Sequence, residues 1–168
     1  MKKTIYIFIF SAAMLLAINI GNSHAQTSKI QAGAGLYYGS SEGSGFGIGA
    51  NGYYSITPNI RAGIDFIYYL GSPENTTYWG LNFNGHYHFE TSGTISPYLL
   101  AGLNVSNFSI DIDIPGAGSG SAGNSEIGLN IGGGAEYPLS FGAFFAEAKY
   151  VISNYDQFVI GAGLRFGF

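Results

Sequence analysis

Charged side chains are scarce in this chain, and most of them lie on one side of segments in which apolar and polar residues alternate. Charged residues make up 10% of the 168 residues. Seven of them would share one face of these segments: Arg61, Asp65, Glu126, Glu136, Glu147, Lys149 and Arg165. Opposite charges pair when buried, because an unpaired buried charge is costly. We therefore expect a charge network inside the fold, in which the Glu147 carboxylate can switch between Lys149 and Arg165.

His86 and His88 are the next candidates for chemistry. On one strand their imidazoles would lie on the same face, about 7 Å apart, and could share a metal ion. No third ligand is near them in the sequence, so polar filling of the interior is the simpler interpretation. Asp111 and Asp113 offer fewer oxygens than a hard cation needs. The stretch from Gly47 to Gly52 matches G-x-G-x-x-G, but it opens no helix, and we predict no metal site and no cofactor.

These residues need strands to position them, and the chain supplies the pattern. After residue 26, apolar residues recur with a period of two, which is typical of β-strands. From Gln157 to Phe168, for example, large apolar residues alternate with glycines and Arg165. The pattern predicts eight strands of roughly 9 to 13 residues each, at 28–38, 45–56, 60–70, 79–89, 97–109, 126–137, 142–152 and 157–168.

An even number of strands with one apolar face predicts an all-β fold, an eight-stranded antiparallel transmembrane up-and-down β-barrel with its apolar face outward. Tight turns near 57–59, 90–95 and 138–140 would alternate with more polar links at 39–44, 71–76, 110–124 and 153–156. In bacterial barrels the short turns are periplasmic and the longer loops are extracellular. The longest link would be a flexible Gly/Ser-rich surface loop at Pro115 to Ser125.

Aromatic residues on the outward face gather at the two ends of the predicted strands, as expected for the two membrane interfaces. The predicted lipid-interface aromatics at the loop ends are Tyr38, Tyr68, Trp79 and Tyr150. Those at the turn ends are Tyr54, Tyr87, Phe89 and Tyr137, together with Phe166 and Phe168.

The first residues read as a secretory signal peptide. Lys2 and Lys3 precede an apolar run, and Ser23-His24-Ala25 forms a small-residue cleavage site. The run is about 16 residues, shorter than the roughly 20 that a membrane-anchoring helix needs. We therefore predict a cleaved signal at 1–25 and a barrel domain at 26–168.

Composition excludes several classes of protein. With no cysteine, disulfides and thiolate sites are absent. After residue 25 only four basic residues stand against ten acidic ones, so nucleic acid is not an expected partner. A soluble β-sandwich or lipocalin-like barrel would need a charged outer face, whereas the second face here is mostly Gly, Asn and Ser.

Over residues 28–168 this pattern resembles the small eight-stranded outer-membrane barrels, the OmpA/OmpX/OmpW-like families. The segment from Gly163 to Phe168 resembles their C-terminal assembly signal, with Phe166 and Phe168 as its apolar positions. The resemblance implies a monomer in the outer membrane of Gram-negative bacteria. Its partners would be outer-membrane lipid, lipopolysaccharide and, during biogenesis, the barrel-assembly machinery. It also implies that the Glu147 switch gates a narrow pore.

We expect an integral barrel with a plugged polar lumen and a structural or surface-interaction role through its extracellular loops, because eight strands leave space for little but side chains. The alternative is a porin-like narrow channel for ions or small solutes, favoured by inward glycines on the first, second and last strands. Tyr37, Tyr53, Tyr69 and Phe145 could instead fill that space. A lipid A-modifying enzyme is not expected, because both histidines face inward at the turn end and no lipid-facing serine accompanies them.

Overall fold

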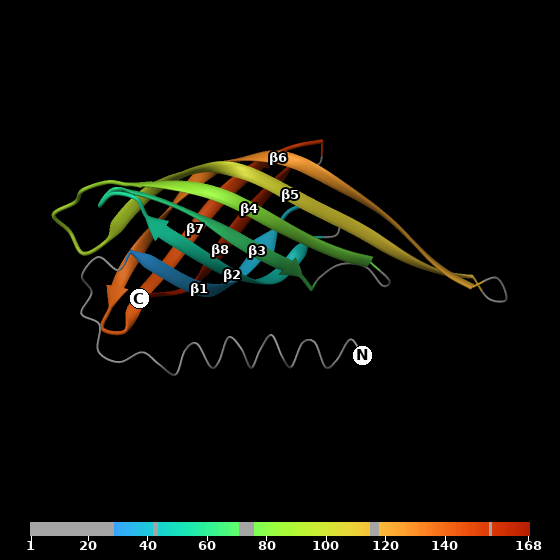
Figure 1. Cartoon of the computed structure of the whole chain (residues 1–168), viewed down its shortest axis with the longest axis horizontal. Helices are drawn as coiled ribbons and strands as arrows, with labels where there is room; N and C mark the ends of the chain where they lie inside the picture. Colours follow the sequence, from blue (N-terminus) through green and yellow to red (C-terminus); the bar gives the residue numbers. More distant parts are fainter. Residues whose placement is uncertain (1–28, 42–43, 71–75, 115–117, 155) are drawn as a thin grey trace.

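The computed structural model describes residues 29–41, 44–70, 76–114, 118–154 and 156–168. These residues form one closed antiparallel barrel, in which each strand pairs with the next and β1 pairs with β8 (Figure 1). The strands are β1 (Ile30–Gly39), β2 (Gly45–Ser55), β3 (Ile60–Tyr69), β4 (Thr76–His88), β5 (Ser96–Ile114), β6 (Gly118–Leu139), β7 (Gly142–Ile152) and β8 (Gln157–Gly167). The predicted eight-stranded barrel is confirmed. The predicted signal peptide lies outside the described residues.

The alternation in the sequence determines which face of each strand is buried. In β8, Phe158 and Ile160 are exposed, whereas Val159 and Arg165 are buried. Successive side chains of a strand point to opposite faces, so one register fixes the inside and the outside of the whole barrel. The polar face is the inner one, the reverse of a soluble barrel. No helix among the described residues is long and apolar enough to cross a membrane.

The hairpin of β5 and β6 corrects the sequence prediction. A flexible loop was expected at Pro115 to Ser125, yet the ladder runs on to the pair Ile114↔Gly118, and β5 and β6 have 19 and 22 residues. In Figure 1 this hairpin projects beyond the other strands. Backbone hydrogen bonds need no large side chains, so the Gly/Ser-rich β6 half shows little of the alternation that marks strands. The β5 half does show it, at Ile110, Ile112 and Ile114.

The other connections follow the expected pattern. The short links 56–59, 89–95 and 140–141 lie at the end of the barrel where β1 begins and β8 ends, which we call the turn end. The opposite, loop end holds the links between β1 and β2, β3 and β4, β5 and β6, and β7 and β8. The side chains of Asp111 and Asp113 are not among those that the structure describes.

The predicted interface aromatics all lie on the outer face. Six of them are exposed: Tyr38, Tyr54, Tyr87, Phe89, Tyr137 and Tyr150. Tyr68 and Trp79 are half-buried, and the Trp79 ring packs 5.9 Å from that of Phe66. Phe166 packs against Phe141, and Phe168 is exposed beyond the end of β8. Their roles at the membrane interfaces and in assembly stay predictions.

Glycines on the inner wall make room for one large ring. A Cβ on Gly161 would lie 2.4 Å from Tyr37 ring carbons, and one on Gly49 would lie 2.7 Å from the same ring. Tyr37 is therefore held between β2 and β8, and its side chain is 4% exposed. Gly49 of the second strand and Gly161 of the last are thus packed against an aromatic side chain.

We predict that Gly161→Ala destabilises the folded barrel by about 1–3 kcal/mol, because the confined Tyr37 ring cannot move away from the added methyl. Urea unfolding in lipid vesicles, followed by the gel mobility of the folded form, measures the change. Gly120→Ala is the matched control, since a Cβ there meets nothing within 4 Å. Equal stability of the two variants would contradict this packing.

Candidate functional site

The interior at the turn end holds a cluster of ion pairs, which we call the ion cluster (Arg61, Glu136, Glu147 and Arg165). Arg61 donates to both oxygens of Glu136, at 2.5 and 3.1 Å. Arg165 also donates to Glu136, through Nη1 at 2.6 Å. The residues reach each other from three strands because Arg61 stands near the start of β3, and Glu136 and Arg165 stand near the ends of β6 and β8. One carboxylate thus bridges two guanidinium groups, the strong form of a charged hydrogen bond.

Glu147 joins this cluster from β7. Its Oε2 lies 3.4 Å from Arg165 Nη2 and accepts a hydrogen bond of 2.9 Å from the Tyr98 hydroxyl. His86 Nε2 is 3.8 Å from the same oxygen. The carboxylate is therefore surrounded by groups that satisfy it inside the barrel, where its residue is 7% exposed.

Lys149 is paired differently from the predicted switch. Its Nζ lies 3.5 Å from Asp65 Oδ2, and no ion pair with Glu147 occurs among the described residues. Asp65 also accepts hydrogen bonds of 2.5 Å from the Tyr53 hydroxyl and from Asn84. Glu147 and Lys149 are two residues apart on one strand, yet Glu147 pairs with Arg165 of the neighbouring strand β8, whereas Lys149 pairs with Asp65 from across the barrel.

Aromatic rings enclose the guanidinium groups. The Arg165 Cζ lies 3.9 Å from the Phe145 ring centre and 4.9 Å from that of Tyr53. Arg61 lies 5.0 Å from the Tyr53 ring and 5.4 Å from the Tyr98 ring. A cation over a ring face is attracted to it, and more so when water is excluded. The rings therefore stabilise the buried bases in addition to the carboxylates.

An asparagine layer follows toward the middle of the barrel, formed by Asn82, Asn84, Asn104 and Asn130. Asn130 Nδ2 donates to the side-chain oxygens of Asn82 and Asn84, and Asn104 Nδ2 donates to Asn82. All four are buried. Their position on the polar face of the strands was expected from the sequence, but their network was not. The only sequence signal for it is that all four lie on the same face of their strands.

The loop end of the interior is apolar. Seven buried side chains pack together as the apolar cluster: Tyr37, Ile67, Tyr69, Tyr78, Phe145, Val151 and Val159. The Tyr69 and Tyr78 rings lie 5.0 Å apart, and the Phe108 ring lies 6.4 Å from that of Tyr78. Gln157 donates to the Tyr78 hydroxyl at 3.0 Å. Sequence analysis named three of these residues and missed the other four, which alternate with outward residues that are just as apolar.

The remaining predicted residues lie apart from the ion pairs or take no metal-like arrangement. Glu126 is a correction: it lies at the loop end, half-buried, and accepts from Asn124 and Asn154. His86 accepts from Arg61 Nε at 3.2 Å and stacks on Tyr98. His88 Nδ1 lies 3.0 Å from the Ser96 hydroxyl. No group of three metal-ligating residues occurs among the residues that the structure describes.

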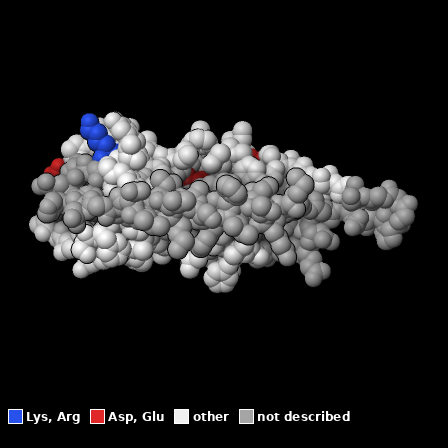
Figure 2. Space-filling model, turned by 60° about the horizontal axis from the view of Figure 1, so that its bottom comes forward, with Lys and Arg blue, Asp and Glu red and all other residues white. Residues whose placement is uncertain are grey.

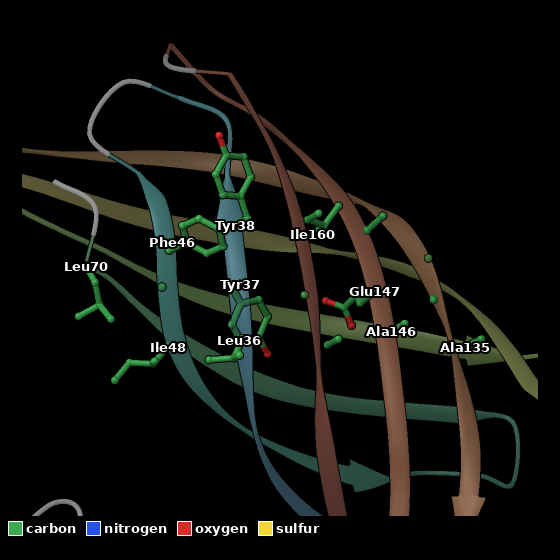
Figure 3. A pocket seen from close by; sticks show the side chains of 16 residues that line it. Leu36, Tyr37, Tyr38, Phe46, Ile48, Leu70, Ala135, Ala146, Glu147 and Ile160 are labelled. Carbon is green, nitrogen blue, oxygen red and sulfur yellow. The ribbon is translucent and has the colours of Figure 1, made fainter.

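The outer surface carries a different kind of feature, an apolar hollow of about 740 Å³. Figure 3 shows large side chains at one side of it, including Phe46 and Ile48, and small ones such as Ala135 and Ala146 at the other. Few of the described residues visible in Figure 2 are charged. Most of the described residues that line the hollow are apolar, so it is suited to hydrocarbon.

Comparisons with known proteins agree with this architecture. Residues 10–166 match the family model of the outer membrane protein β-barrel domain. The structure is similar to neisserial surface protein A, with a TM-score of 0.63 and 24% identity over 83% of this chain and 96% of that one. The N-terminal barrel of Pseudomonas aeruginosa OprF gives a TM-score of 0.62 and 19% identity over 84% of this chain and 100% of that one.

A third solved structure is that of Ail, the attachment invasion locus protein of Yersinia pestis. It has a TM-score of 0.55 and 17% identity, and the match covers 83% of this chain and 97% of that one. No curated protein matches the chain in sequence. With most of its length matched by the family model and its strands closed into the same barrel, the chain belongs to the outer-membrane β-barrel family of bacteria.

Proposed function

We propose that this protein is a non-conducting outer-membrane barrel, with its interior filled by side chains and with its loop end serving as a surface for interaction outside the cell. The observation that carries the proposal is the apolar cluster. Its rings and branched side chains come from β1, β3, β4, β7 and β8 and meet in the interior. The cluster extends from Phe145, which contacts Arg165 of the ion cluster, to residues near the loop end such as Tyr69 and Tyr78. An ion crossing that layer would lose its water without gaining polar ligands.

The ion cluster supports the same function from the other end. Arg61, Glu136 and Arg165 are each hydrogen-bonded to one another or to aromatic neighbours, and each is at most 8% exposed. Such a fully paired set holds β3, β6, β7 and β8 together across the interior. In this proposal the cluster is structural, and Glu147 does not act as a gate.

The rest of the proposal follows from the place of the barrel. The signal peptide at 1–25 directs export, the barrel-assembly machinery inserts a monomer, and outer-membrane lipid and lipopolysaccharide surround the apolar face. The loop end then faces outward and the turn end faces the periplasm, as in bacterial barrels. No catalytic activity is proposed, since His86 and His88 are enclosed by Arg61, Tyr98 and Ser96.

A narrow channel is the second candidate, and one observation favours it. Lys149 Nζ, Asn104 Oδ1 and Asn130 Oδ1 are buried and have no hydrogen-bond partner among the described residues. Polar groups of this kind are suited to binding water. A hydrated middle layer conducts ions only if the apolar cluster opens. The narrow channel should therefore give a measurable current, and the filled barrel should give none.

The first prediction concerns conductance. The barrel should give no steady single-channel current in a planar bilayer, and a variant with Tyr69→Ala and Tyr78→Ala should give one, because both removed rings belong to the apolar cluster. Tyr38→Ala, on the outer face, is the matched control and should stay silent. Steady current through the unmodified barrel would overturn the proposed filled lumen in favour of the channel.

The second prediction concerns the ion cluster. Glu136→Gln should lower the free energy of unfolding by about 3–5 kcal/mol, because it leaves buried Arg61 without a carboxylate partner and buried Arg165 with Glu147 alone. Glu126→Gln, at the half-exposed loop end, should change it by less than about 0.5 kcal/mol. Urea titration in vesicles compares the two. Similar losses would mean that the buried pairs do not hold the barrel together.

A further inference from the structure

The β5–β6 hairpin leaves one edge of β6 unpaired. β6 pairs with β5 as far as Gly118, but its ladder with β7 begins only at Leu129↔Ile152. Among the described residues, Gly118 to Gly128 therefore have a strand on one side only. At the base of this stretch, Glu126 accepts a hydrogen bond from Asn154, and Gly128 lies beside Ile152 and Ser153. At about 3.3 Å per residue this free edge is roughly 33 Å long.

The ladder also shows which groups point to the open side. Phe89 N donates to Pro97 O, so the odd-numbered residues of β5 bond toward β4 and the even-numbered ones bond toward β6. Their partners on β6 are even-numbered as well. The odd-numbered residues of β6 therefore direct their N–H and C=O groups to the open side. These are Ser119, Ser121, Gly123, Ser125 and Ile127.

Nothing in the sequence of this edge blocks another strand. Natural sheets protect their edges with lysine, proline or cover by another element, and residues 118–128 contain neither lysine nor proline. Residues 120–125 are exposed. An edge of this kind is a template for strand addition, in which the backbone supplies the affinity.

Charge indicates what kind of strand fits. Residues 107–128 contain Asp111, Asp113 and Glu126 and no base. Of the four bases after residue 25, Arg61, Lys149 and Arg165 are 4% exposed or less, and Lys29 lies at the turn end. The loop end thus has no base to oppose its acids. Glu126 is on the strand that a partner would adjoin, and Asp111 and Asp113 are on the next strand, β5. Like charges repel across neighbouring strands and through the net charge of the hairpin, so an acidic strand is disfavoured and a basic one is favoured.

We infer that the free edge of β6 binds an extended, lysine- or arginine-bearing segment of another protein by adding it as a strand. The inference rests on the proposed function for its setting, since the edge must be outside the cell to meet such a partner. It specifies the surface, residues 118–128, and the chemistry of the occupant. The partner pairs with the outward backbone groups of Ser121 and Ser125, and its bases are opposite in charge to the acidic residues of the hairpin.

The test uses the purified barrel in nanodiscs of uncharged lipid and a fluorescent peptide of the same length as the edge, alternating threonine and lysine. Three peptides are compared by fluorescence anisotropy: this one, its glutamate counterpart, and the lysine peptide with alternate backbone nitrogens methylated. Each peptide is tested on three barrels: the unmodified one, a proline variant with both Ser121→Pro and Ser125→Pro, and an alanine variant with both Ser121→Ala and Ser125→Ala. Proline removes outward donors and leaves the β5 ladder intact, whereas alanine keeps them.

The lysine peptide should bind the unmodified barrel and the alanine variant equally. It should bind the proline variant at least about tenfold more weakly, because two backbone hydrogen bonds are lost. The glutamate and methylated peptides should not bind. Binding of the methylated peptide, unchanged binding to the proline variant, or no binding of the lysine peptide would each overturn the inference. So would self-association of the barrel that the proline variant abolishes, since the occupant would then be a second copy.

Folding is checked by gel mobility, and the proline variant must shift as the alanine variant does. If it does not, Gly123→Pro replaces it, since that residue also directs its N–H to the open side. Antibody access to a tag in the hairpin on intact cells tests the proposed orientation separately. An inaccessible tag with intact peptide binding would overturn the orientation alone, whereas an accessible tag without binding would overturn the inference alone.

Discussion

Everything in this structure depends on pairing the backbone. In hydrocarbon no water is available to hydrogen-bond N–H and C=O groups, so a sheet that crosses a membrane must close on itself. Here β1 pairs with β8 from Gln31↔Gly167 to Gly39↔Val159, and the barrel has no free edge at that height. Closure fixes the alternation of every strand at once, and with it the division into an apolar outside and a polar inside.

Closure of eight strands also sets what the interior must be. Eight strands leave an interior only about as wide as side chains, and the described inward side chains form three layers. Arg61, Glu136, Glu147 and Arg165 pair near the turn end, asparagines bond to one another in the middle, and aromatic and branched side chains pack near the loop end. Each layer pairs like chemistry, with charge next to charge, amide next to amide, and apolar surface next to apolar surface. In the middle layer Asn104 Oδ1 and Asn130 Oδ1 have no hydrogen-bond partner among the described residues.

Much of the fold could be predicted from the sequence because the period of two is a local property. Phe158, Ile160 and Arg165 reveal their faces without any knowledge of neighbours. Partners across the barrel are not local, which is why Lys149 pairs with Asp65 rather than with Glu147 beside it. The extension of β6 was missed because glycine and serine give little alternation of apolar and polar residues. The period of two gives the face of the strand on which Glu126 lies but not its position along the barrel axis, so Glu126 was wrongly placed among the buried ion pairs.

The burial of the bases has a consequence for chemical labelling. After residue 25 the chain has two lysines, of which Lys29 is exposed and Lys149 is 2% exposed. An amine-reactive reagent therefore reaches Lys29 in the folded barrel and reaches Lys149 Nζ only when the wall between β7 and its neighbours opens. The extent of reaction at Lys149 thus reports, at a single atom and without any engineered probe, how often the closed sheet comes apart.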